Sequence, residues 1–197
     1  MSFRKNVTER GSSIIEVLAV LAVIGMVGMG LLSGYNYVMG KFNTSKIVTH
    51  AQALMKTLST YFSSYRIYPA MSATQLFGLG FLNADYYDEQ THKAMHPFEG
   101  EITFSTKDNG LRYSFTYHDL PGNVCVAMAT MDIPVANLYS IKIGDHTARM
   151  YPEPGVAYKQ TVHLPFVMSE AAKECGDVSN QDSKGNDNDI DIEFTFM

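Results

Sequence analysis

The sequence has no cluster of lysine or arginine beyond its first ten residues, and its formal net charge is −5. Proteins that bind nucleic acid usually present such a cluster, because its charge neutralises phosphate groups. Motifs for enzymatic chemistry are also missing: there is no Gly-x-Ser-x-Gly, no phosphate-binding glycine loop and no Cys-x-x-Cys. We therefore expect no nucleic-acid partner, no enzymatic activity and no bound cofactor.

Charged side chains are absent from residues 17–40, a run of 24 positions. As an α-helix this run would be about 36 Å long, which exceeds the hydrocarbon core of a bilayer at about 30 Å. We therefore predict one membrane-spanning helix. Before the run, three basic residues stand against one acidic residue: Arg4, Lys5 and Arg10 against Glu9. This excess of positive charge predicts a cytoplasmic N-terminus and export of the remaining chain.

The length of the apolar run also bears on processing. An ordinary cleaved signal peptide has an apolar core of roughly 7 to 15 residues, followed by a cut site of small residues. This run is longer and continues without a clear turn, so we do not expect the whole segment to be removed. Glu16 stands at its start, where a carboxylate is costly unless a cation pairs with it.

Residues 11–18 read Gly-Ser-Ser-Ile-Ile-Glu-Val-Leu, between a short basic leader and the apolar run. This arrangement resembles the class III signal of type IV prepilins and of type II secretion pseudopilins. The resemblance implies that a prepilin peptidase cuts between Gly11 and Ser12, so that residues 1–11 are a removed leader. It also implies that Glu16 pairs with the free α-amine of Ser12 on a neighbouring subunit and sets the axial register of assembly.

The sequence departs from that family at its first mature residue. The family usually has a large apolar residue there, often N-methylated, whereas this chain has Ser12. Methylation of Ser12 therefore stays open. The alternative for the whole region is an uncleaved signal anchor in which Glu16 lies at the membrane interface, where a carboxylate costs little.

Apolar residues recur at three- and four-residue steps after residue 41, the pattern of an amphipathic helix. Together with the apolar run they predict one helix from about Ser13 to Tyr65, on the order of 80 Å long. Residues 12–40 would form the membrane or filament-core part, residues 41–66 the amphipathic part, and residues 67–197 a globular head. Glycines in the apolar part predict close helix contacts or local unwinding in a filament; they are Gly25, Gly28, Gly30 and Gly34.

The head shows alternating apolar and polar positions on both sides of Asn109-Gly110, which predicts a β-hairpin. Alternation also predicts strands at 138–143 and 189–196, while the run 124–131 fits either a short helix or a buried strand. Residues 166–175 fit a helix that ends at Gly176. Residues 71–100 read as an irregular connector that includes at most one short helix. The stretch His96-Pro97-Phe98-Glu99-Gly100 is similar to a turn of type IVb and conjugative thin-pilus pilins.

Two cysteines, Cys125 and Cys175, follow the apolar run. An even number in an exported domain favours a disulfide, and closing a loop of about 50 residues would stabilise the fold by roughly 4 kcal/mol. Two unrelated buried thiols are the alternative.

Two candidate metal sites are disfavoured by their residues. His92 and His96 lie one helical turn apart, but Lys93 replaces the expected glutamate and Pro97 would end a helix. We expect a solvated or hydrogen-bonded pair there.

The acidic stretch from Asp182 to Glu193 has the length of a calcium-binding EF-hand loop, with Asn186 at its fifth position. However, Lys184 replaces a ligand and Asp187 replaces the required glycine. We expect a solvated loop followed by a strand, rather than a calcium site.

These observations predict an α+β fold with a long N-terminal helix packed against an antiparallel sheet. The resemblance implies the major subunit of a type IVb or conjugative thin pilus, a homo-oligomeric helical filament. Its precursor would lie in lipid of the bacterial inner membrane, meet the pilus assembly machinery there and then become extracellular. The alternatives are a minor pilin or type II secretion pseudopilin, and a membrane-anchored extracytoplasmic binding domain that never polymerises. Conjugation and cell adhesion stay open as roles.

Overall fold

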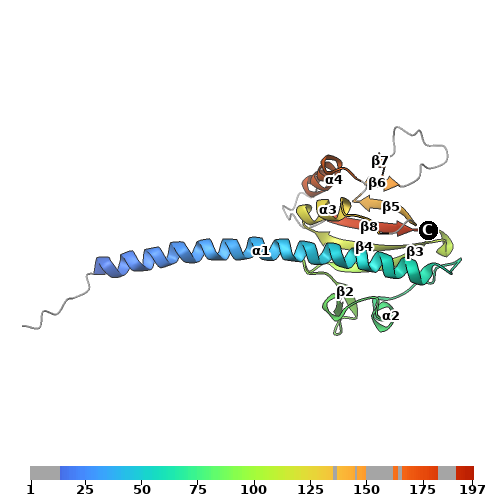
Figure 1. Ribbon diagram of the computed structural model, residues 1–197, viewed down its shortest axis with the longest axis horizontal. Coiled ribbons are helices and arrows are strands. Elements are labelled where there is room, and N and C mark those ends of the chain that lie inside the picture. The colour runs from blue at the N-terminus through green and yellow to red at the C-terminus, as the bar shows by residue number, and fades with distance from the viewer. Residues whose placement is uncertain (1–13, 135–136, 145, 150–161, 164–165, 182–189) are drawn as a thin grey trace, which may run out of the picture. The chain divides into compact units, whose positions relative to one another are not determined.

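The computed structural model describes residues 14–134, 137–144, 146–149, 162–163, 166–181 and 190–197 (Figure 1). The chain forms two compact units, Met1–Phe42 and Asn43–Met197, and helix α1 (Ile14–Phe62) supplies residues to both. Its bounds lie within three residues of the predicted ones. The unit Asn43–Met197 comprises the second part of α1 as well as the predicted head at 67–197. It is called the head from this point on, and it holds all the other described elements.

Among the described residues, three helices and eight strands follow α1, together with two short 3-10 turns at Ala84–Tyr86 and Asp108–Gly110. The helices are α2 (Ala73–Gly78), α3 (Gly122–Ala129) and α4 (Met168–Gln181). The strands are β1 (Tyr87–Asp88), β2 (Lys93–Met95), β3 (Glu101–Lys107), β4 (Arg112–Leu120), β5 (Leu138–Ile143), β6 (His146–Arg149), β7 (Val162–His163) and β8 (Ile190–Phe196).

The strands form one sheet in the order β1-β2-β3-β4-β8-β5-β6-β7 (Figure 1). The pairings are antiparallel except for β6 with β7, which is parallel. Strand β8 therefore lies in the centre, between β4 and β5, although it comes last along the chain. The predicted α+β architecture is confirmed, with this one parallel edge pair as a difference.

The second part of α1 packs on one face of this sheet, which we call the inner face. The ring of Phe62 lies 4.9 Å from that of Tyr113, and His50 reaches the hydroxyl of Tyr117 at 2.9 Å. Because side chains alternate along a strand, every second residue of β4 and β8 points to this face. Burying each large apolar side chain contributes about 1.5–3 kcal/mol; those at 2% exposure or less include Ile47, Leu54, Met55, Leu58, Phe115, Ile192, Phe194 and Phe196.

Four details differ from the expectations or resolve them. The hairpin forms as predicted, but a 3-10 turn joins its strands, with Asp108 and Asn109 at positive φ. Residues 124–129 of the run 124–131 are helical and belong to α3. Helix α4 continues past Gly176, because no left-handed residue ends it there. The connector 71–100 contains one short helix, α2, as expected. It also contains the strands β1 and β2, which were not predicted because two and three residues are too few to show alternation.

Candidate functional site

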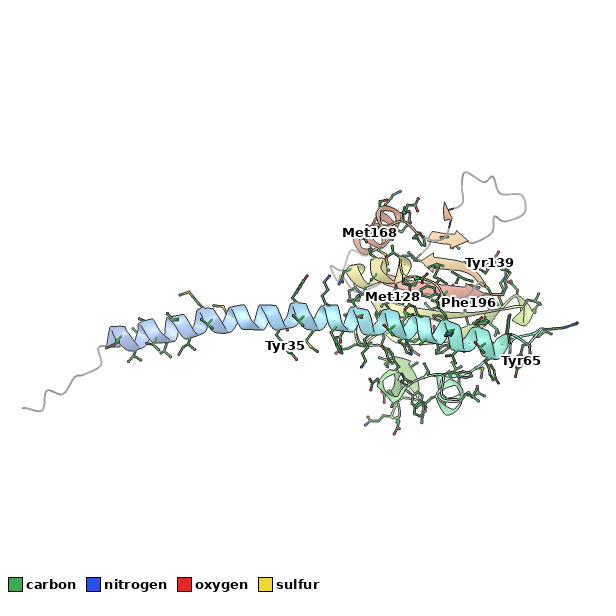
Figure 2. All side chains as sticks on the ribbon, in the orientation of Figure 1. Tyr35, Tyr65, Met128, Tyr139, Met168 and Phe196 are labelled. Carbon is green, nitrogen blue, oxygen red and sulfur yellow. A yellow bond between two sulfur atoms is a disulfide. The ribbon has the colours of Figure 1, made fainter. Side chains whose placement is uncertain are left out.

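The first part of α1 exposes its apolar side chains. Between Val17 and Phe42, the large apolar side chains whose positions are described range from 36% exposed at Met39 to 68% at Tyr37. Tyr35, which is labelled on this part of the helix in Figure 2, is 63% exposed. Soluble monomers rarely expose a continuous apolar surface of this length, so such a surface usually binds a partner or lipid.

The structure does not identify the membrane-spanning helix predicted for residues 17–40: across the residues that it describes, no helix combines the length and hydropathy expected of a span.

Glu16 lies in the first turn of α1 and is exposed. A carboxylate is favourable at this end of a helix, because the partial positive charge of the helix dipole is located there. Gly11 and Ser12 lie outside the described residues, so the predicted cleavage and the pairing of Glu16 with Ser12 stay predictions.

The glycines of the apolar part leave α1 unbroken in this single chain. A Cβ atom added at Gly25 or Gly34 would have no other atom within 4 Å. Packing against the described residues therefore does not require glycine at either position. The predicted close contacts would have to be made with another helix.

Cys125 and Cys175 form the predicted disulfide, which joins α3 to α4 with their Cα atoms 6.0 Å apart. Both cysteines are buried, at 0% and 1% exposure. Helix α3 packs on α4 and against β8, and both Met128 of α3 and Phe196 of β8, which are labelled in Figure 2, are fully buried. The bridge therefore ties α4 to the helix that contacts the central strand.

A buried polar junction in the head was not anticipated. The ring of His50 stacks on that of Tyr86 with centroids 3.6 Å apart, and its Nδ1 lies 2.9 Å from the Tyr117 hydroxyl. Burial lowers the pKa of His50 from 6.5 to about 4, with a smaller contribution from repulsion by His96. One signal was available in the sequence, because His50 follows Ile47 by three residues and so falls on the apolar stripe of the helix.

The two histidines weighed as a zinc pair do not converge. His96 is buried; its Nε2–H donates to the His118 carbonyl at 2.6 Å, and its Nδ1 accepts from the Phe98 N–H at 3.2 Å. His92 is exposed and lies 3.0 Å from the Tyr87 hydroxyl. The described residues contain no group of three metal-binding side chains.

A row of polar side chains crosses the outer face of the sheet, opposite α1. The Nδ1–H of His118 donates to Asp191 at 2.9 Å, and its Nε2 accepts from the Thr103 hydroxyl at 2.8 Å. Glu193 pairs with Lys107. Of the acidic stretch weighed for calcium, Asp182 and Asn186 lie outside the described residues, whereas Asp191 and Glu193 are engaged in these contacts.

A polar hollow of about 360 Å³ adjoins this row, lined by Thr116, Lys142, Gly144, Asp191 and Glu193. Its lining combines one cationic side chain with two carboxylates, so charges of both signs face the same space.

Comparison with known proteins gives a family match and several matching solved structures. Residues 43–197 match the family model described as Bundlin. The type IV b pilin from Salmonella typhi is similar in structure, with 16% sequence identity, a TM-score of 0.50 and coverage of 75% of this chain and 95% of that one. TcpA, a type IV pilin from Vibrio cholerae El Tor, has 17% identity, a TM-score of 0.49 and coverage of 79% and 99%. No curated protein sequence matches the chain significantly.

Proposed function

The chain belongs to the bundlin family of type IVb pilins, and from this premise we propose that it is the major subunit of a pilus and polymerises through the N-terminal part of α1. The observation that supports polymerisation is the exposed apolar surface between Val17 and Phe42. In a filament, copies of this helix would bury that surface against one another. Gly25 and Gly34 leave room for such contacts, because a Cβ added at either position would have no described atom within 4 Å apart from the local helix backbone.

Before assembly, the uncharged residues 17–40 would be covered by inner-membrane lipid, with the basic leader on the cytoplasmic side. A prepilin peptidase would cut after Gly11. The assembly machinery would then add each subunit to the filament, where the α-amine of Ser12 would neutralise Glu16 of a neighbouring copy. This pairing is favourable because a desolvated carboxylate needs a cation.

Analysis of sheared surface filaments by intact mass and N-terminal sequencing tests the proposal. We expect a mature chain that begins at Ser12 and gains two hydrogens on reduction, and that is the most abundant protein of the filament. A chain that retains Met1 and is missing from every filament fraction would contradict polymerisation. A chain present only in trace amounts would indicate a minor pilin.

A matched pair of variants tests the role of Glu16. Glu16→Gln removes the charge that would pair with Ser12, so we expect at least a tenfold loss of filaments at normal precursor levels. Glu9→Gln makes the same chemical change in the leader, which is removed before assembly, and should leave the filament yield unchanged. Equal yields from the two variants would exclude a role for the Glu16 charge.

A further inference from the structure

His50 joins α1 to a segment that follows it by more than thirty residues. Its ring lies nearly parallel to that of Tyr86, at an interplanar angle of 7°. The Tyr86 hydroxyl in turn donates to the Lys46 carbonyl at 3.0 Å, and Lys46 pairs with Asp85 at 2.7 Å. Tyr86 ends the 3-10 turn Ala84–Tyr86, which leads directly into β1. The imidazole therefore contacts the start of the segment 84–95.

The surroundings of His50 suit a neutral imidazole only. His50 is only 7% exposed, and its Nδ1 contacts the hydroxyl of Tyr117, which is fully buried. Its Nε2 is buried and has no hydrogen-bond partner among the described residues. A protonated imidazole has two N–H donors, so protonation would leave a charged donor unsatisfied in a largely apolar environment, which is costly.

The groups that face His50 offer no compensation for a positive charge. Tyr86 and Tyr117 contact it from two sides, and Tyr117 also contacts the ring of His96, which repels a charge at His50. The backbone carbonyl of His118 accepts from His96, and the His118 ring donates to Asp191 on the outer face. Asp85 is engaged with Lys46, and among the described residues no carboxylate hydrogen-bonds to His50.

We propose that His50 is a pH-sensitive switch, and that its protonation releases the segment 84–95 from α1 while the rest of the head stays folded. The released segment moves Tyr86 off the imidazole, so that water can solvate the charged ring. The inference does not depend on polymerisation.

The direction and the pH window follow from the two pKa values of His50. In the closed state burial holds its pKa at about 4, and in the released state it returns to 6.5. The released state therefore binds the proton more tightly, and acid favours it, mainly between pH 6.5 and pH 4. With these two pKa values, the equilibrium constant for release of the segment should increase on the order of 50-fold when the pH falls from 7 to 4.5. The Lys46–Asp85 pair should persist over this range, because Lys46 lowers the pKa of Asp85 below 3.8.

Hydrogen exchange measured by mass spectrometry on the full chain in detergent micelles tests the switch. Exchange rates would be corrected for the intrinsic pH dependence of unstructured peptides. Peptides covering 84–95 should show the 50-fold increase in opening between pH 7 and pH 4.5, whereas peptides covering β8 should keep their protection. Parallel loss of protection in β8 would mean global acid unfolding and would overturn the proposal.

Three variants isolate the imidazole. His50→Phe keeps a ring to stack on Tyr86, and His50→Gln keeps a polar group near Tyr117, but neither can take up a proton in this range. Both should change their opening less than threefold between the two pH values. His92→Asn removes an exposed histidine from the same segment, at a position of positive φ that asparagine tolerates, and should keep the wild-type response. A full acid response in His50→Phe or His50→Gln would overturn the proposal.

Proton NMR of the histidine Cε1–H signals supplies an independent readout. The resonance missing from His50→Phe should titrate well below pH 6.5 in the wild-type chain. A midpoint near 6.5 would show that the closed state does not discriminate against the charged ring, and would also overturn the proposal.

Discussion

Leu21 and Leu54 are both leucines of helix α1, yet Leu21 is 58% exposed and Leu54 is 1% exposed. Both stretches of α1 are rich in apolar residues. The described apolar side chains of the stretch in the head are buried against a sheet of the same unit, whereas those described between Val17 and Phe42 are exposed. An apolar stretch of α1 can therefore be helical without being buried. Burial requires a surface to pack against, and the sheet provides that surface for the stretch in the head.

The difference has an energetic consequence. A buried leucine contributes roughly 1.5–3 kcal/mol relative to an exposed one. Side chains before Asn43 should contribute almost nothing to the stability of the isolated chain, and would contribute only after lipid or neighbouring subunits cover them. Mutations in the two stretches should accordingly affect different measurements: stability of the head in one case, assembly in the other.

Removal of the disulfide should have the largest effect, and only on the head. The double variant Cys125→Ser/Cys175→Ser frees a loop of 50 residues in the unfolded chain, which should cost about 4 kcal/mol. Thermal unfolding of the full chain in detergent, followed by near-ultraviolet circular dichroism of tyrosine, should show a midpoint lower by roughly 8–16 °C. Reductant should lower the wild-type midpoint similarly and leave the variant unchanged. An unchanged variant midpoint would mean that α4 is held by packing alone.

The paired variants Leu54→Ala and Leu21→Ala test the comparison most directly. Leu54→Ala should destabilise the head by about 3 kcal/mol, because it removes buried methyl groups and leaves a cavity. Leu21→Ala should stay within about 0.5 kcal/mol, since its side chain is exposed in the single chain. Both are measured by the same thermal unfolding. Equal losses would show that the first stretch of α1 is covered within the chain after all.

Glycine substitutions should have opposite signs in the two units. A Cβ at Gly100 would lie 2.1 Å from the His118 carbonyl oxygen and 2.3 Å from the His96 Nε2, so Gly100→Ala should cost about 1–3 kcal/mol through overpacking. Gly25→Ala meets no atom and should favour the helix by up to about 1 kcal/mol. Thermal unfolding reports the first, and helicity by far-ultraviolet circular dichroism the second. Tolerance of alanine at Gly100 would require the turn 96–100 to move.

Polar contacts on the outer face should matter least. Lys107 is 42% exposed in its pair with Glu193, and ion pairs of this kind contribute about 0.2–1 kcal/mol. Lys107→Met should therefore shift the midpoint by only a few degrees, and less at high salt, where the pair is already screened. A shift as large as that of Leu54→Ala would place this pair among the main stabilising contacts of the head.

Helices and strands with a clear apolar period were predicted accurately from the sequence. Contacts between segments that are distant along the chain were not predicted. Strand β8 was predicted because Ile190, Ile192 and Phe194 alternate with polar residues, and all three are fully buried. Helix α1 was predicted because no proline interrupts its apolar stripe. By contrast, the run at α3 is apolar on every side, so its period could not separate helix from strand.

Residues of the candidate site were identified from the sequence only where residue type and position along the chain were sufficient. Glu16 and the two cysteines were identified from residue type and position, although the role of Glu16 remains a prediction. The junction of His50 with Tyr86 and Tyr117 was missed, because the three residues are separated by up to 67 positions and meet only when the sheet forms. Similarly, nothing in the sequence indicates that His118 lies between Thr103 and Asp191.

The central position of β8 has a consequence for the order of events during synthesis. A ribosome completes β3, β4, β5 and β6 before it reaches residue 190, yet β4 and β5 can join one sheet only through β8. Until that strand is made, the two groups of strands present unpaired edges that invite wrong partners. The head must therefore remain unfinished through most of its own translation, and its closure waits for one late strand to enter between two earlier ones.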